Sequence, residues 1–407
     1  MSMPILRWLI LGLPWVVVPW ALHDPWIQPK EAILQVGLWT FILLSLRSPV
    51  TLNFWHRPSA MWFGVWVVVS GMGHYWWALL MSTSAPVFNP LPTFAILGGL
   101  LFIWVLRSHY LMRYDLQVRL TSWVVWSSIL ISLVAISQFL GLHHGLFKTD
   151  TMTRFHSMSL LAGFGNVGYL VTVVAMVMPL TLVFRSRWML LAGGLMGLVL
   201  LCSHARYAQV AALAGLTCYG WLRLARHYRF HRWFLPLSLV IFIGVVSLLA
   251  PIAWVWLRAD ERYAVWHMTW LAWQKQAWLG AGIGDFFVTF YAKWAQTYQY
   301  LLDTYVHIPN TRWSWAHNDL LQALRELGLI GMIPLVCWGA VLLRDAFRKV
   351  MMAHPPHDVL HAGWLSAFIV LLILSGTYMP WHLAISALFG LIIVAMCEAP
   401  IGSGGGA

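Results

Sequence analysis

Residues 188–222 read WMLLAGGLMGLVLLCSHARYAQVAALAGLTCYGWL, which is two apolar runs joined by a turn from Ser203 to Tyr207. An apolar helix of about 20 residues is long enough to cross a bilayer, and the two runs come close to that length. We therefore predict a helical hairpin that crosses a membrane twice, over 188–204 and 208–222, with its tight turn at one membrane face.

The rest of the chain repeats this pattern of apolar runs and short polar connections. Apolar residues make up 60% of the 407 residues and charged residues only 9%, whereas charged residues make up about 25% of soluble domains. The predicted fold class is all-α and polytopic, with one membrane domain over 1–400 and a glycine-rich end at 402–407 that is typical of an added linker. The predicted spans, about twelve, are 5–22, 31–46, 60–81, 91–106, 121–141, 160–184, 188–204, 208–222, 233–256, 319–343, 361–378 and 382–397.

Basic residues cluster in alternate loops, and such loops usually lie in the cytoplasm. Both termini are therefore predicted to be cytoplasmic. The same distribution explains the net charge of +12 without a nucleic-acid partner. The basic loops contain Arg47 and Arg57; Arg107, Arg113 and Arg119; Arg185 and Arg187; Arg223, Arg226, Arg229 and Arg232; and Arg344, Arg348 and Lys349. The outer-face segments are then 23–30, 82–90, 142–159, 204–207, 257–318 and 378–381.

Only one outer segment is long, the loop over 257–318. It contains two aromatic-rich, helix-like stretches, 262–279 and 285–305, with a flexible break predicted between them from Gly280 to Gly284. Aromatic residues with scattered lysines are typical of helices that lie in a membrane interface. The loop is interpreted as a lid over a lipid-fed site or as a packing layer, and these two interpretations are compatible.

Several basic side chains are predicted to meet at the outer face: Arg206, Arg258, Arg262, Arg312 and His317. A guanidinium so close to lipid needs an anionic partner or a water-filled cavity, unless it extends to a lipid headgroup. Its planar fork can hold phosphate oxygens bidentately, so two or three arginines on one face suit a pyrophosphate. A histidine can take a proton from a sugar hydroxyl near neutral pH, although many histidines at helix starts only pack or cap.

Other polar residues are given structural interpretations. Asn318 or Asp319 can cap the helix that follows, and Arg325 and Glu326 are expected to have a structural role inside it. The string Gly163 to Gly168 is interpreted as a broken or re-entrant helix that lines a cavity, because no strand precedes it. The outer carboxylates show no metal-binding spacing, so no metal site is predicted.

Four stretches then resemble a known family, the O-antigen ligase and polymerase superfamily. Residues 316–331 (AHNDLLQALRELGLIG) resemble its HNxxLxxxxExGxxG signature. Residues 203–209 resemble its outer Ser-Arg turn, with His and Ala inserted between the two. Residues 262–286 are similar to its stretch of Arg, Trp and spaced glycines, and 164–168 to a Gly-Asn segment in which Gly168 replaces a common second Asn.

The resemblance implies about twelve helices of GT-C-like glycosyltransferase architecture, with a large periplasmic loop between the ninth and tenth. It implies a multi-pass protein of the bacterial inner membrane, an active site that faces the periplasm, an undecaprenyl-pyrophosphate-linked glycan as donor, and no metal or cofactor. In the family the signature His is the proposed base and two Arg are essential. Matched to this sequence, these residues are His317, Arg206 and Arg262.

The expected function is that of an O-antigen ligase, which transfers the glycan with inversion to the lipid A–core oligosaccharide of lipopolysaccharide. Its expected partners are the donor, that acceptor and the membrane lipids. Alternatives within the family are an O-antigen polymerase and a pilin O-oligosaccharyltransferase, and a further alternative is a lipid or glycan transporter without covalent chemistry. The residues expected to bind substrate are Arg206, Arg262, Arg258, Arg312 and Asn318.

Overall fold

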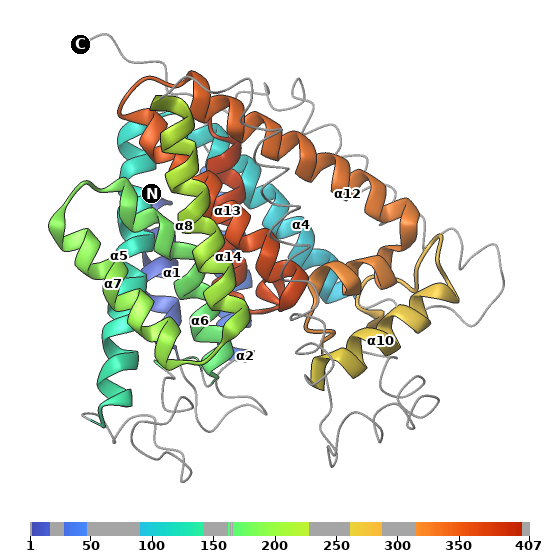
Figure 1. The fold of residues 1–407 in the computed structure, drawn as a ribbon. Helices are drawn as coiled ribbons and strands as arrows, with labels where there is room; N and C mark the ends of the chain where they lie inside the picture. The colour runs from blue at the N-terminus through green and yellow to red at the C-terminus, as the bar shows by residue number, and fades with distance from the viewer. Residues whose placement is uncertain are drawn as a thin grey trace.

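The computed structural model describes residues 2–16, 28–46, 90–141, 162, 164, 166–227, 261–286 and 315–400. All the regular structure in these segments is helical, as the sequence predicts (Figure 1). The α-helices are α1 (Met3–Gly12), α2 (Gln28–Ser45), α4 (Pro90–Val105), α5 (Tyr114–Phe139), α6 (Val167–Val177), α7 (Arg187–Cys202), α8 (Arg206–His227), α10 (Glu261–Gln274), α12 (Asp319–Met352), α13 (His357–Thr377) and α14 (Ala384–Glu398). Shorter helical turns cover Leu13–Trp15, Leu106–Tyr110, Met178–Val183 and Pro380–His382.

Several of these helices have the length and composition of membrane spans. Among the described residues, α5, α12 and α13 are long and apolar enough to cross a bilayer, and α1, α4, α6, α7 and α14 belong to shorter apolar helices. Two predicted spans, 60–81 and 233–256, lie outside the described residues, and each of the other predicted spans overlaps a described helix. By length and composition, the described helices are those of a polytopic membrane protein.

The centre of the bundle is α13, which packs against α8, α12 and α14. A helix that is apolar on all sides has to be buried, and the side chains of α13 are buried along most of its length. Trp364 is fully buried there and donates its indole N–H to Thr121 Oγ1 at 3.0 Å. Gly215 on α8 lets the two helices approach, because a Cβ at this position would lie against Val370 and 2.9 Å from Pro179.

The helix ends that carry the basic loops meet at one end of the bundle. Asp358, at the start of α13, forms ion pairs with Arg223 at 2.5 Å and Arg226 at 3.1 Å, both at the end of α8. Arg226 also donates to the carbonyl of Val350 near the end of α12 at 2.6 Å. We call this the arginine-rich end. The opposite end collects the starts of α6, α8 and α12 and the end of α13, and it contains the candidate site described below.

The segment that follows α10 docks onto a break in α12. Gly328 interrupts α12 with φ 63° and ψ −175°, and α12 turns sharply at this point (Figure 1). Around the break, Leu329 N–H donates to Ala277 O at 2.9 Å and Gly282 N–H donates to Glu326 O at 3.0 Å. Two further bonds, Ile330 N–H to Trp278 O and Ala281 N–H to Arg325 O, complete the docking. The predicted single span over 319–343 is therefore bent, and the predicted flexible break at 280–284 is a hydrogen-bonded connection.

Gly280 and Gly328 permit this docking because their backbones touch. A Cβ on Gly280 would lie 2.5 Å from the carbonyl oxygen of Glu326 and 2.5 Å from the nitrogen of Gly328. The backbone of Gly328 also lies in a φ/ψ region that is almost exclusive to glycine. Neither position can accept a side chain unless the two segments separate.

We expect Gly280→Ala and Gly328→Ala each to detach the α10 segment from α12. For Gly328→Ala the backbone strain alone costs about 1–3 kcal/mol, and the clash adds to it. The measurement is thermal unfolding in detergent together with limited proteolysis of residues 261–286. Gly194→Ala is the control, because a Cβ there meets nothing within 4 Å. Unchanged melting and proteolysis in both variants would contradict the docking.

Candidate functional site

His317 stands at the start of α12 in an unusual backbone conformation. Asn318 caps the helix, and its side-chain oxygen accepts the N–H of Leu321 at 2.9 Å. His317, one residue earlier, has a φ of 53°, a left-handed conformation that is uncommon outside glycine and is often found at functional sites. Its carbonyl accepts the indole N–H of Trp266, on α10, at 3.2 Å. The cap and this bond fix the position of His317 between α10 and α12.

A cationic and aromatic cluster surrounds His317. Tyr207 on α8 and Tyr378 after α13 stack with centroids 4.7 Å apart and an interplanar angle of 18°. The guanidinium carbon of Arg262, on α10, lies 4.8 Å from the centroid of the Tyr207 ring and 5.2 Å from that of Tyr378. The imidazole of His317 meets Tyr378 edge-on at 5.7 Å. These four residues, here called the Arg262 cluster, come from four elements that are far apart in the sequence.

Gly168 supplies the space for the two tyrosines. A Cβ at this position would clash with the hydroxyl of Tyr378 and lie 2.9 Å from that of Tyr207. The Tyr207 hydroxyl donates to the Gly168 carbonyl at 3.3 Å, while Asn166 caps α6 by accepting the Gly168 N–H at 2.7 Å. The segment predicted as a broken helix is, in its described part, the capped start of α6. An Asn in place of Gly168 would clash with the Tyr378 hydroxyl, which gives a steric reason for glycine at this position.

Asp319 and His382 clamp the turn that carries Tyr378, and the sequence analysis did not identify this pair. One carboxylate oxygen of Asp319 lies 2.6 Å from His382 Nδ1, and the other accepts the N–H of Trp381 at 3.1 Å. The Asp319 N–H donates to the Tyr378 carbonyl at 3.1 Å. The stacked ring of Tyr378 is thereby tied to the first residue of α12.

A buried amide determines which nitrogen of His382 carries the proton. The side-chain oxygen of Gln322 accepts the Ala316 N–H at 3.1 Å, so its NH₂ group faces Glu326 Oε1 and His382 Nε2, each at 3.1 Å. His382 Nε2 therefore accepts, and Nδ1–H donates to Asp319. Burial lowers the pKa of His382, but the neighbouring carboxylates of Asp319 and Glu326 outweigh it, and the pKa is raised overall. Protonation of Nε2 would break the bond from Gln322.

His317 has the opposite electrostatic environment. Burial, the positive charge of Arg262 and the charge that His382 carries when it is protonated lower the pKa of His317 to about 3. At neutral pH the imidazole is therefore uncharged and has a nitrogen lone pair. It can accept a proton, but only weakly while the site holds no negative charge.

The other predicted site residues differ in where the structure places them. Arg206 is the first residue of α8, adjacent to Tyr207, and its side chain is exposed. Asn318 is beside His317, but its side-chain oxygen caps α12. Arg258 and Arg312 lie outside the described residues, so their predicted role stays a prediction. The structure thus brings Arg262 and His317 together and places Arg206 one residue from a member of the cluster.

Glu326 and Arg325 hold the α10 segment, in agreement with the structural role predicted for them. The carboxylate of Glu326 accepts the N–H groups of Gly284 at 3.0 Å and Phe286 at 3.4 Å. Arg325 forms an ion pair with Asp285. The positions of the family signature therefore have distinct tasks here: Asn318 caps the helix, Glu326 binds loop amides, and Gly328 admits the docking.

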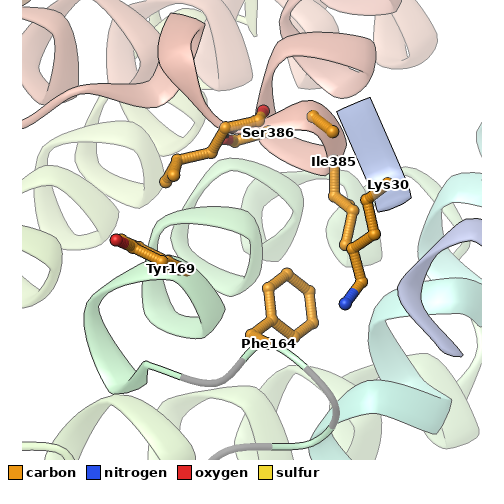
Figure 2. A pocket seen from close by; sticks show the side chains of 7 residues that line it. Lys30, Phe164, Tyr169, Ile385 and Ser386 are labelled. Atoms are coloured by element: carbon orange, nitrogen blue, oxygen red, sulfur yellow. Dashed lines mark hydrogen bonds between the residues drawn. The ribbon is translucent and has the colours of Figure 1, made fainter. Parts of the chain in front are cut away.

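A small cavity adjoins the cluster on the side of α2 (Figure 2). Its volume is about 20 Å³, enough for roughly one water molecule and too small for a sugar. The amino end of the buried Lys30 points toward the ring of Phe164, and Tyr169 completes the wall toward Tyr378 (Figure 2). Among the described residues, no three His, Cys, Asp or Glu side chains come together in a way that could hold a metal ion.

The fold and this cluster define a polytopic membrane protein with a cationic, aromatic site at one end of its helices. Residues 191–336 match a family model described as O-Antigen ligase. The chain therefore contains an O-antigen ligase family domain over these residues, and the recognition made from the sequence is confirmed. Arg206, Tyr207, Arg262 and His317 lie inside the matched segment, whereas Tyr378 and His382 lie beyond it. No curated protein sequence matches the chain.

We expect Arg262→Met to raise the pKa of His317, because it removes one of the positive charges that lower it. In the unaltered protein His317 should stay neutral from about pH 5 to about pH 8, where an ordinary histidine titrates. The measurement is NMR of histidine-labelled protein in detergent, with the signal assigned by His317→Gln. Arg187→Met, on the first residue of α7, is the matched control. Titration of His317 near its ordinary pKa in the unaltered protein would contradict the described burial.

Proposed function

We propose that the protein is an O-antigen ligase. It would transfer a glycan from undecaprenyl pyrophosphate to the lipid A–core oligosaccharide at the periplasmic face of the bacterial inner membrane. The observation that supports this most directly is the Arg262 cluster, in which a guanidinium lies over two stacked tyrosines and a neutral histidine packs against the second of them. The family match over 191–336 supports a glycan-transferring enzyme.

The proposed donor site uses Arg262 and Arg206, with Arg258, Arg312 and Asn318 as further binding residues. The guanidinium of Arg262 lies within cation–π distance of both rings, and a guanidinium has five N–H donors in a planar fork. Those N–H groups can hold pyrophosphate oxygens bidentately. The charge that develops on the pyrophosphate as it leaves would be stabilised by the same groups.

The proposed base is His317, and donor binding would make it effective. Burial and the positive charge of Arg262 lower the pKa of His317. A pyrophosphate beside Arg262 brings negative charge, which offsets this effect and raises the pKa toward the range of an efficient base. His317 would then take the proton of the acceptor hydroxyl only after the donor has bound.

The proposed reaction is a direct displacement. The acceptor hydroxyl gives its proton to His317, and its oxygen forms a bond to the anomeric carbon. The bond from that carbon to the pyrophosphate oxygen breaks, and undecaprenyl pyrophosphate leaves with the electron pair. Attack opposite the leaving group inverts the anomeric configuration. No metal ion or cofactor takes part in this scheme.

The proposed topology and domain plan follow from the same scheme. About twelve spans form one membrane domain over 1–400, of GT-C-like architecture, with both termini in the cytoplasm. The loop over 257–318 would lie against the periplasmic leaflet as a lid, and its described residues are 261–286, which include α10, and 315–318. Trp270 and Trp278, both exposed in this region, suit an interfacial position.

The experiment is complementation in a strain that lacks its own ligase, with lipopolysaccharide separated on a gel. His317→Ala, Arg262→Ala and Arg206→Ala are each expected to lower transfer by roughly 10²–10³-fold, because each removes a contact made mainly in the transition state. Arg187→Ala, at the other end of the bundle, should retain the long-chain ladder at matched membrane levels.

The outcomes separate the parts of the proposal. If the unaltered protein restores no ladder but lengthens a lipid-linked polymer or adds mass to a pilin, the acceptor is wrong and the site stands. If it forms no glycosidic bond yet still moves the lipid-linked glycan, the enzyme proposal fails. Full ladders from all three site variants would refute the assignment of these residues.

Asp319→Asn and His382→Gln should reduce transfer while they leave the donor-binding arginines in place. Each change weakens the clamp on the turn of Tyr378, and loss of such a supporting bond typically costs about 10–100-fold in activity. We expect the loss mainly in kcat, with little change in the KM for donor, in purified protein with labelled donor. His354→Gln, an exposed histidine at the arginine-rich end, is the control. If these variants lose thermal stability to the same extent as activity, the contacts of Asp319 and His382 have only a structural role, and the prediction is wrong.

A further inference from the structure

A groove of about 620 Å³ lies between α1 and the first part of α5, at the arginine-rich end and far from the candidate site in the fold. The start of α5 is at this end because the ring of Tyr114 packs 4.1 Å from that of His357, at the start of α13. The groove is lined chiefly by Arg7, Trp8, Leu11, Leu116, Arg119 and Trp123.

Two guanidinium groups, those of Arg7 and Arg119, line this groove. The Arg7 guanidinium lies over the ring of Trp123, 5.9 Å from its centroid. The nearby Asp115 pairs with Arg113 at 2.9 Å, outside the groove. Within the part of the chain that the structure describes, neither Arg7 nor Arg119 forms an ion pair. Their charges are therefore available to an anion from outside the protein.

The groove changes from cationic to apolar along the helix axes. Arg7 and Arg119 lie about 6–8 Å from the first residues of their helices, at a rise of about 1.5 Å per residue. Leu11 and Trp123 lie about one further turn along, toward the middle of the bundle. The half-exposed Trp8 forms part of the wall, and Gly12 leaves the groove open beside it, since a Cβ there would come 3.2 Å from the Trp8 indole nitrogen.

We propose that this groove binds an anionic phospholipid of the leaflet at the arginine-rich end. Its phosphate would be held by Arg7 and Arg119, and one acyl chain would run along Leu11 and Trp123. Basic pockets between membrane helices on the cytoplasmic side are suited to anionic headgroups. The inner part of the groove is apolar and aromatic, so it can bind an acyl chain. A free phosphate has no acyl chain, and this part of the groove therefore favours a lipid. This site is separate from the proposed donor site, and its existence does not depend on the proposed function.

The test is native mass spectrometry of the full chain in a non-ionic detergent, titrated with phosphatidylglycerol or phosphatidylcholine. The unaltered protein should retain phosphatidylglycerol preferentially, and Arg7→Gln/Arg119→Gln should bind it about thirty-fold more weakly. Arg185→Gln/Arg187→Gln is the matched control, because it removes two charges at the same end but outside the groove. It should bind as the unaltered protein does.

A second variant keeps both charges and fills the groove. Gly12→Leu should also weaken retention of phosphatidylglycerol, because its side chain takes the place of the acyl chain. Inorganic phosphate at millimolar concentration should not displace the lipid. The proposal is overturned if the groove and control double variants lose lipid equally, if both phospholipids bind alike, or if phosphate alone competes fully.

Discussion

The candidate site depends on one contact, the docking of the segment after α10 onto the break in α12. Four backbone hydrogen bonds cross between residues 277–282 and 325–330, and Glu326 binds two more amides of the segment. Arg262 belongs to the helix that this docking holds. Together with the bond from the Trp266 indole N–H to the His317 carbonyl, this docking brings the guanidinium of Arg262 from α10 to Tyr207 and Tyr378. Gly280 and Gly328 are therefore requirements of the site, although neither touches the Arg262 cluster.

Much of this arrangement could be predicted from local patterns in the sequence. Apolar runs and alternating basic loops identified the helices, because lipid exposure and loop charge leave a signal at each position. The Asn318 cap and the structural role of Glu326 could also be predicted, because both follow from the position of the residue in a single helix. His317 and Arg262 were predicted to share a site, and the structure places both against Tyr378.

The remaining features depend on contacts between distant segments, which a single sequence does not encode in any local pattern. Tyr378 is predicted only as an outer turn residue, yet its ring supports both Arg262 and His317. Asp319 and His382 are more than 60 residues apart, and only the fold makes them a pair. The glycines at 280–284 were predicted to be flexible, because glycine permits many backbone conformations. The composition of this stretch does not show that the backbone of α12 packs against it.

The two ends of the bundle treat positive charge in contrasting ways. At the arginine-rich end, Asp358 forms ion pairs with both Arg223 and Arg226, which fixes the helix ends and offsets part of their positive charge. At the site, aromatic rings position Arg262. A ring attracts a cation without cancelling its charge, so Arg262 keeps its effect on its surroundings. Burial is the main cause of the low pKa of His317, and the charge of Arg262 lowers this pKa further. An anion that binds Arg262 must therefore also change the basicity of His317, and this coupling follows from their shared position alone.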